Sequence, residues 1–160
     1  MEIREGLPDD LGRLIDFMEL VDHEFVPPLS LRPGGIYDRV SGTLAKVDSN
    51  FLIGESNGRV VGAVGYRKNW NGIEEVMGEA YISFIAVHPG YRGQNIARLL
   101  DRALAKKLWS DWMTHVNVTT WSTNPGAYRM YQQLGYVVSK TLEDHRGPGV
   151  DTIYFRKSFK

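Results

Sequence analysis

The chain has 160 residues, of which 42% are hydrophobic and 24% charged, and its 19 basic and 19 acidic residues cancel to zero net charge. A chain of this length buries roughly two thirds of its unfolded surface, which predicts one domain over residues 1–160. The balanced charge excludes any strong expectation of nucleic acid as a partner. There is no apolar run of membrane-spanning or signal-peptide type, so we expect a cytoplasmic protein without a membrane partner.

The chain contains no cysteine, and its four histidines are scattered. Without cysteine there is no disulfide, no thiolate ligand for zinc and no cysteine nucleophile. The histidines do not show the spacing of a helical metal-binding pair. We therefore expect no metal site.

The first half of the chain alternates between strands and helices. A short N-terminal strand precedes a helix that has apolar residues at helical spacing from Leu11 to Val21, with Asp9 or Asp10 as its cap. Residues 22–50 are rich in Pro and Gly and predict a loop that contains one short helix. Residues 51–67 predict two strands joined by a tight turn at Asn57 and Gly58.

The second half predicts a strand–helix–strand crossover and a C-terminal pair of strands. Asn124 suits a helix N-cap, Pro125 the first helical position and Gly135 the C-terminal cap. The order predicts an α/β fold, mixed with α+β character, in which helices flank a mixed sheet of six to seven strands. The expected elements are strands at 71–89, 115–123, 136–142 and 151–159 and helices at 92–109 and 125–135.

The turn between the strand ending at Pro89 and the following helix is the first candidate for a binding site. A glycine-containing turn before a helix aims backbone N–H groups and the positive end of the helix dipole at one point, which favours an anion. Arg92 adds a positive charge, and Gly93 leaves room for a phosphate. The alternative is that the glycines only shape the turn and Arg92 is solvated. Neither a P-loop nor a G-x-G-x-x-G motif is present here.

Two segments resemble the GNAT superfamily of N-acetyltransferases. "ISFIAVHPGYRGQNIARLLDRAL" is similar to its acetyl-CoA-binding segment, whose Arg/Gln-x-x-Gly-x-Gly/Ala pattern falls on Arg92, Asn95 and Ala97. "NPGAYRMYQQLGY" is similar to its late segment, and the strand order agrees over nearly the whole chain. Asn95 replaces the usual glycine, and asparagine tolerates a left-handed backbone best among other residues. Asn95 either adopts that conformation or simply caps the helix.

The resemblance implies acetyl-CoA as co-substrate and no metal. Amides from Gly93 to Ala97 would hold the pyrophosphate. The pantetheine arm would lie beside the strand where residues 80–88 and 116–123 splay apart, much as an added strand would. The cofactor-binding residues implied are Ile85, Ala86, Val87, Arg92, Gly93, Gln94, Asn95, Ile96, Ala97, Asn124 and Tyr131.

The activity implied is transfer of an acetyl group from the thioester to a primary amine. Since the chain lacks cysteine, direct attack by the amine is the simplest route. Tyr131 matches the tyrosine that faces the thioester sulfur in this family. A tyrosine pKa of about 10 against about 8.5 for a thiol makes it a hydrogen-bond donor to the thiolate rather than a full acid. Without the resemblance, Tyr131 is a packed helix residue and Asn124 a helix cap.

The general base and the acceptor pocket are less defined. Tyr81 stands where many relatives carry a glutamate, so we hypothesise that Glu79, two residues earlier on the same strand face, deprotonates the amine while Tyr81 lines the pocket. The alternative is a solvated Glu79 at the strand start. Glu24 would attract a cationic amine, whereas Arg32 and Arg146 would pair with a carboxylate or phosphate.

Two wider questions stay open at this point. The acceptor is a small-molecule amine or a peptide or protein amine. The alternative function is a non-catalytic acyl-CoA-binding domain, which the missing glutamate at Tyr81 would favour. An edge strand near the C-terminus makes a homodimer possible.

Overall fold

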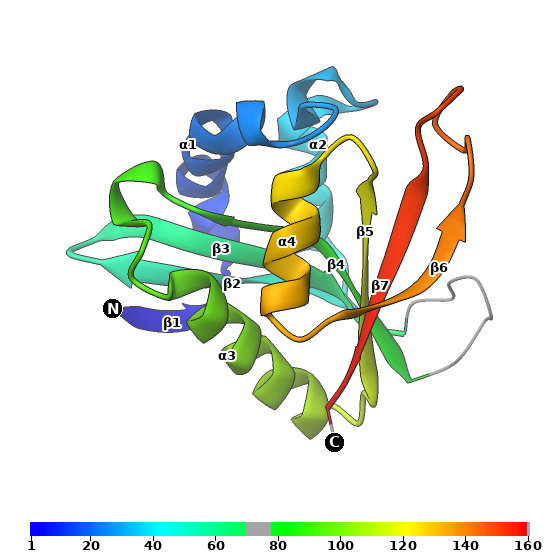
Figure 1. Cartoon of the computed structure of the whole chain (residues 1–160). Coiled ribbons are helices and arrows are strands. Elements are labelled where there is room, and N and C mark those ends of the chain that lie inside the picture. Colours follow the sequence, from blue (N-terminus) through cyan, green and yellow to red (C-terminus); the bar gives the residue numbers. More distant parts are fainter. Residues whose placement is uncertain (70–77, 160) are drawn as a thin grey trace.

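The computed structural model describes residues 1–69 and 78–159. In these residues a mixed sheet of seven strands is flanked by α-helices, which confirms the predicted fold class (Figure 1). The strands are β1 (Glu2–Glu5), β2 (Ser49–Ser56), β3 (Arg59–Arg67), β4 (Glu79–Val87), β5 (His115–Trp121), β6 (Val137–Leu142) and β7 (Thr152–Ser158). The helices are α1 (Leu11–Val21), α2 (Gly35–Ala45), α3 (Ile96–Ser110) and α4 (Pro125–Gln133).

The sheet order is β1-β2-β3-β4-β5-β7-β6, and every neighbouring pair is antiparallel except β4–β5. The expected hairpin is formed by β2 and β3. Its two turn residues, Asn57 and Gly58, have φ values of 51° and 74°. Positive φ at both turn positions matches the twist of a two-residue hairpin, and asparagine and glycine adopt it readily.

The two faces of the sheet are covered by different helices (Figure 1). The helix α3 buries one apolar stripe, which includes Leu100, Leu104 and Leu108, on the face that α4 also covers. The helices α1 and α2 pack on the opposite face, where Leu14 and Val40 are fully buried. The central strands are therefore covered on both faces, and within the sheet their backbone polar groups become accessible where two neighbouring strands separate.

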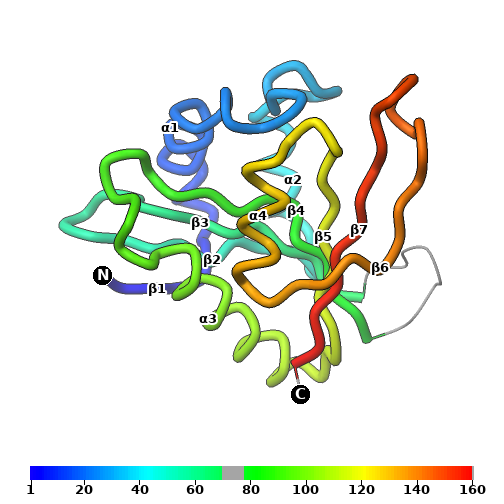
Figure 2. The backbone as a smooth tube through the Cα atoms, in the orientation of Figure 1, coloured from blue at the N-terminus to red at the C-terminus, as the bar shows by residue number. Residues whose placement is uncertain are grey.

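The strands β4 and β5 separate at the middle of the sheet. Their parallel register extends only from Glu79–His115 to Tyr81–Asn117. Beyond these pairs the two traces diverge, as Figure 2 shows, so the predicted splay is confirmed. A bulge lies just after the last pair, since Tyr66 of β3 pairs with Ile82 and the adjacent Gly65 pairs with Phe84. The extra residue, Ser83, bends β4 where the two strands part.

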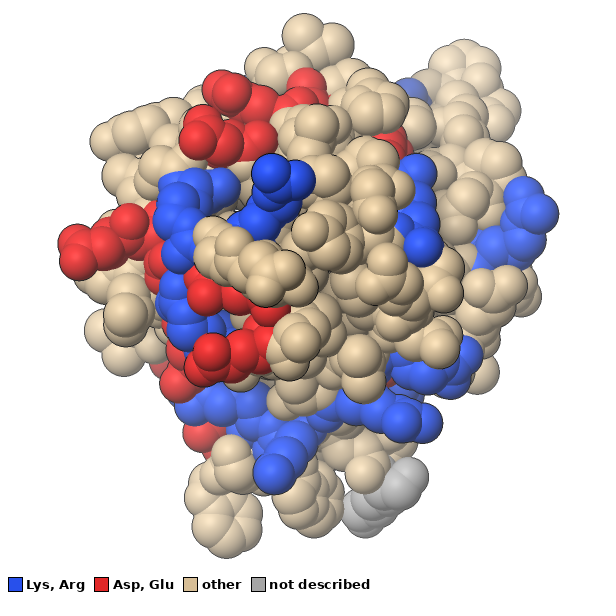
Figure 3. Space-filling view, turned by 90° about the vertical axis from the view of Figure 1, so that its left-hand side faces the viewer, with Lys and Arg blue, Asp and Glu red and all other residues tan. Residues whose placement is uncertain are grey.

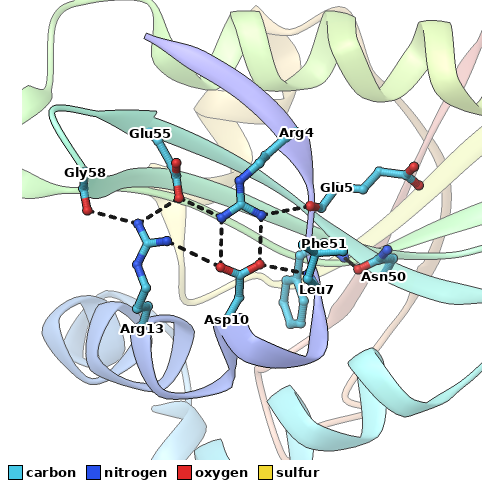
Figure 4. Close-up of polar contacts among 9 residues, drawn as sticks. All are labelled: Arg4, Glu5, Leu7, Asp10, Arg13, Asn50, Phe51, Glu55 and Gly58. Atoms are coloured by element: carbon cyan, nitrogen blue, oxygen red, sulfur yellow. Dashed lines mark hydrogen bonds and ion pairs between the residues drawn. The ribbon is translucent and has the colours of Figure 1, made fainter.

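The start of α1 differs from the prediction that an aspartate caps it. A 3-10 turn over Pro8–Asp10 precedes the helix, and α1 has no side-chain cap. Asp10 is instead buried, and it accepts hydrogen bonds from the Leu7 N–H and from Arg4 (Figure 4). The predicted strand at 71–89 begins at Glu79 in the structure, and its residues 71–77 lie outside the described part of the chain.

Acidic and basic side chains lie side by side on the face shown in Figure 3, which carries no broad surface of one sign. This mixture agrees with the zero net charge of the sequence. None of the helices in the described ranges is long and apolar enough to cross a membrane.

Candidate active site

A cavity of about 770 Å³ opens where β4 and β5 separate. Its walls come from both of these strands, from the turn before α3, from α4, and from α2 with the loops next to it. A cavity of this size at the opening of a sheet is typical of a small-molecule site. All of the sequence-predicted site residues except Glu79 and Gln94 line it.

The turn before α3 forms one wall and has the geometry of an anion site. Gly93 has φ 77° and Asn95 has φ 59°, and the Asn95 side chain makes no cap hydrogen bond. The left-handed conformation expected of Asn95 is therefore confirmed, and the alternative of a side-chain cap is wrong. The helix begins at Ile96, so its first N–H groups, including that of Ala97, have no carbonyl partner within the helix. Gln94 is exposed in the same turn and does not line the cavity.

Arg92 lies at the mouth of this turn and forms an ion pair with Glu24. The Arg92 side chain is 52% exposed, so solvent screens the pair and the guanidinium can exchange partners. The structure thus pairs a residue expected to bind phosphate, Arg92, with a residue expected to attract the acceptor amine, Glu24. Because the Glu24 carboxylate is engaged by Arg92, it is not a free anion that would attract a cationic amine.

The edge of β4 offers backbone groups to the cavity. The N–H of His88 donates to the carbonyl of Val61 in β3 (2.8 Å). Hydrogen-bonding direction alternates along an antiparallel pair, so the backbone groups of Ala86 also face β3, whereas those of Ile85 and Val87 face away from it. Ile85 and Val87 thus present N–H and C=O groups where β5 has diverged, and their side chains pack in the core beneath α3. The expectation that the Ala86 backbone serves a ligand is not met, although Ala86 does line the cavity.

The helix α4 places Asn124 and Tyr131 on the opposite wall. Asn124 accepts a hydrogen bond from the Ala127 N–H (3.1 Å), so the cap role is confirmed, and its side chain also borders the cavity. Tyr131 is buried with its ring against those of Tyr136 and Phe155. Burial raises the pKa of the Tyr131 phenol well above its usual value, so the hydroxyl keeps its proton at neutral pH.

The structure separates the two residues that were expected to act together on the acceptor amine. Tyr81 lines the cavity, and its hydroxyl shares a hydrogen bond with Thr119 (2.7 Å). Glu79 lies at the closed end of the β4–β5 pair, outside the cavity lining. It is 6% exposed and accepts a hydrogen bond from the Arg156 Nε at 2.6 Å.

Glu79 is therefore neither the general base nor the solvated residue at the strand start that the sequence suggested. A buried carboxylate paired with a guanidinium is neither solvated nor well placed to take a proton from an amine in the cavity. The carboxylate instead ties β4 to β7, because Arg156 belongs to β7. The described residues also contain no group of three His, Cys, Asp or Glu side chains placed to hold a metal ion.

Sequence reasoning missed two charged residues of the cavity wall. One is Arg39 of α2, which lies near Arg32. A signal was available, because Arg39 follows Ile36 by three residues and precedes Val40, which puts it beside the apolar face of a helix. Arg98, in the first turn of α3, was also missed.

Comparison with known proteins agrees with this geometry. The model of the acetyltransferase (GNAT) family matches residues 15–136. An acetyltransferase of Yersinia pestis (strain Pestoides F) is 34% identical over 92 residues, which cover 58% of this chain. The matched region spans only 60% of the length of that relative.

Solved structures match the fold over nearly its full length. An aminoglycoside 6'-N-acetyltransferase complexed with coenzyme A has a TM-score of 0.81 at 17% identity, covering 100% of this chain and 98% of that one. The ribosomal-protein-S18-alanine N-acetyltransferase of Escherichia coli has a TM-score of 0.75 at 17% identity, covering 99% and 94%. At these identities the likeness concerns the fold alone. The family model, which spans most of the residues that build the cavity, shows that the chain belongs to the GNAT family of acetyltransferases.

Proposed function

We propose that this protein transfers an acetyl group from acetyl-CoA to a primary amine. The observation that carries the proposal is the meeting of three features on one cavity: the N–H-rich turn with Arg92, the open edge of β4, and the buried Tyr131. The coenzyme A complex of the aminoglycoside N-acetyltransferase neighbour supports the choice of acyl donor.

The cavity suits the two ends of acetyl-CoA. The free N–H groups of Ile96 and Ala97, with the Arg92 guanidinium, would bind the pyrophosphate charges. The backbone groups of Ile85 and Val87 would pair with the amides of the pantetheine arm, as an added strand does. Binding would draw Arg92 away from Glu24, because a pyrophosphate carries more negative charge than one carboxylate.

The chemistry needs a polarised carbonyl and a stabilised thiolate. Acetyl-CoA supplies an acetyl group whose carbon–sulfur bond breaks as the carbon bonds to the amine nitrogen; the amine loses one proton and the sulfur gains one. The N–H of Val87 would donate to the carbonyl oxygen, and the Tyr131 hydroxyl to the departing sulfur. The high pKa of Tyr131 keeps that proton in place through neutral pH. The chain has no cysteine to carry the acetyl group, so the amine attacks directly.

Proton removal from the amine does not depend on a free carboxylate. Among the described residues that line the cavity, the only acidic side chain is Glu24, which is held by Arg92. The acceptor therefore reacts as the neutral amine after losing its proton to solvent. We expect kcat/KM to rise tenfold per pH unit up to the pKa of the acceptor amine, about 8 to 10.4 for common amines.

Isothermal calorimetry with acetyl-CoA tests the binding half of this proposal. We expect Arg92→Ala to weaken binding about tenfold, since a charge-assisted hydrogen bond contributes about 1.5–3 kcal/mol. Arg59→Ala is the matched control, because Arg59 is exposed on β3 outside the cavity. Glu24→Gln should tighten binding a few-fold by releasing Arg92. An absence of acetyl-CoA binding to the native protein would contradict the proposal.

The lack of a free carboxylate in the cavity also favours a second candidate, a non-catalytic acyl-CoA-binding domain. Release of coenzyme A, measured with a thiol reagent across a panel of amines, separates the two. Amine-dependent release supports the enzyme, whereas tight binding with no release supports the second candidate. A cytoplasmic location and a homodimer through the β6 edge stay predictions.

A further inference from the structure

Three arginines from distant parts of the sequence line one end of the cavity. Arg32 follows the 3-10 turn at 29–31, Arg39 belongs to α2, and Arg146 lies in the loop between β6 and β7. Tyr81 lines the same cavity, and its hydroxyl binds Thr119 on β5. An acceptor held in this cavity would therefore meet both the proposed acetyl-CoA groups and the three arginines.

Neutral groups orient these arginines. The Nε and Nη2 atoms of Arg32 donate to the Pro27 carbonyl at 3.0 and 2.9 Å. The Nε of Arg146 donates to Thr152 (2.9 Å), and its guanidinium lies 5.2 Å from the centre of the Trp121 ring. These contacts fix the positions of two guanidiniums without neutralising them.

The positive charge at this end of the cavity is only partly compensated within the described residues, where the charge of Asp22 acts on Arg32. None of Arg32, Arg39 and Arg146 forms an ion pair there. The Nε of Arg39 is buried and has no hydrogen-bond partner in that part of the chain. Burial, and then the nearby charge of Arg39, lowers the pKa of Arg32. A buried donor without a partner and mutually repelling charges are costly arrangements unless a ligand completes them.

Two acidic residues in this region make their direct contacts with other groups. Asp22 interacts with the charge of Arg32, but its carboxylate accepts hydrogen bonds from the N–H and the hydroxyl of Ser30, at 2.9 and 2.5 Å. Glu24, the acidic residue of the cavity lining, is paired with Arg92. The missing negative charge is therefore expected to come from the substrate.

We propose that the acceptor is a small amine that also carries a carboxylate or phosphate group, and that Arg32, Arg39 and Arg146 bind this group. The inference rests on the proposed acetyl transfer and specifies its substrate class. A small acceptor fits because the cavity of about 770 Å³ must also hold the arm of acetyl-CoA. A polycationic acceptor such as an aminoglycoside would be repelled by the three guanidiniums, even though an aminoglycoside enzyme shares the fold.

Matched acceptor pairs test the proposal with acetyl-CoA as donor. The pairs are O-phosphoethanolamine against ethanolamine, and β-alanine against β-alaninamide, with kanamycin as the polycation, each compared below the pKa of its amine. We expect kcat/KM at least about tenfold higher for the anionic member of at least one pair, as charge-assisted hydrogen bonds predict. Equal or better turnover of the neutral partners or of kanamycin overturns the inference, as does activity confined to peptides.

Variants identify the residues responsible. Arg39→Gln and Arg146→Gln should each lower kcat/KM for the anionic acceptor about tenfold and change that for its neutral partner by less than about twofold. Arg59→Gln is the control outside the cavity. For Arg32 the variant is Arg32→Lys, which keeps the positive charge. Arg32→Gln would also release the loop at Pro27, because Arg32 donates a hydrogen bond to the Pro27 carbonyl. Equal losses for both members of a pair would show a structural role and overturn the assignment.

Acetyl-CoA affinity keeps the two proposals distinguishable. The three arginine variants should bind acetyl-CoA within about twofold of the native protein, because they lie away from the anion turn. If the native protein binds acetyl-CoA and acetylates only neutral or cationic amines, the acetyl-transfer proposal stands and the substrate inference fails. If it binds no acetyl-CoA, both fail.

Discussion

Two groups of arginines in this protein have opposite surroundings. Near the N-terminus, Arg4 and Arg13 converge on two carboxylates, those of Asp10 and Glu55, as Figure 4 shows. Arg4 binds Asp10 through two hydrogen bonds of 2.8 Å. In the cavity group a carbonyl orients Arg32, and a hydroxyl and an aromatic ring orient Arg146; no described carboxylate forms an ion pair with these two or with Arg39. The same residue type therefore serves two different purposes.

The difference shows how partners determine the role of a charge. In the N-terminal group the hydrogen bonds from Arg4 lower the pKa of Asp10 from 3.8 to about 2, so this carboxylate stabilises the folded state. In the cavity group no described carboxylate forms an ion pair with a guanidinium, and burial, followed by the like charge of Arg39, lowers the pKa of Arg32. A group that is neutralised internally contributes to stability, whereas a group left charged in a cavity is available to a ligand.

The strongest test of this contrast removes two charges of the cavity group. The double variant Arg39→Gln/Arg146→Gln should lower kcat/KM for an anionic acceptor about 100- to 1000-fold, since two charge-assisted hydrogen bonds are lost. Steady-state kinetics with O-phosphoethanolamine or β-alanine measures the effect. Unchanged kinetics in a folded double variant would show that the cavity arginines do not bind the acceptor, and the contrast between the two groups would then be wrong.

A smaller effect separates anion binding from the transfer chemistry. Tyr131→Phe should lower kcat about 10- to 100-fold for every acceptor, because one hydrogen bond to a developing thiolate is lost. Tyr128→Phe, on the same helix and outside the cavity lining, is the matched control. Full activity of Tyr131→Phe would exclude the proposed donor role.

The N-terminal group should affect stability and not activity. Asp10→Asn should lower the free energy of unfolding by roughly 2 kcal/mol at pH 7, since about two pKa units of stabilisation are lost. Because the folded-state pKa of Asp10 is depressed, its contribution is complete above about pH 4 and disappears as pH falls through about 2. Urea unfolding at a series of pH values measures the difference, with the exposed Asp9→Asn as control. A constant difference down to pH 2 would contradict this assignment.

The smallest expected effect is the contribution of the cavity arginines to the stability of the folded protein. Arg39→Gln should change the free energy of unfolding by less than about 0.5 kcal/mol or increase it, since Arg39 has no ionic partner among the described residues and repels Arg32. The same urea titration at pH 7 gives the value. A loss of more than about 1 kcal/mol would place Arg39 with the N-terminal group as a structural charge.

Local signals in the sequence predicted many of these features correctly. Asn57 and Gly58 predicted the hairpin, because both residues tolerate the positive φ that the turn requires. Asn124 predicted the start of α4, since its side chain can bond the N–H three residues on. The same tolerance made a positive φ one of two alternatives for Asn95, and the structure has it. Each of these signals acts within a few residues of the chain.

Interactions between distant segments could not be predicted in this way. Glu79 was expected to act as the general base, but its ion pair with Arg156, 77 positions away, gives it a structural role. The pairing of Glu24 with Arg92 brings together a residue of the loop after α1 and a residue of the turn before α3. The bulge at Ser83 depends on the register against β3, which no local pattern of β4 defines.

The sequence by itself determined where the chain turns, which residues are apolar enough to form the core, and where an anion turn precedes a helix, because these properties depend on backbone preferences over a few residues. Only the tertiary structure decided which charges are neutralised. A carboxylate or a guanidinium has the same chemistry wherever it stands, but its pKa and its availability depend on burial and on partners that the fold brings from far away in the chain. The proposed substrate class follows from that second kind of information.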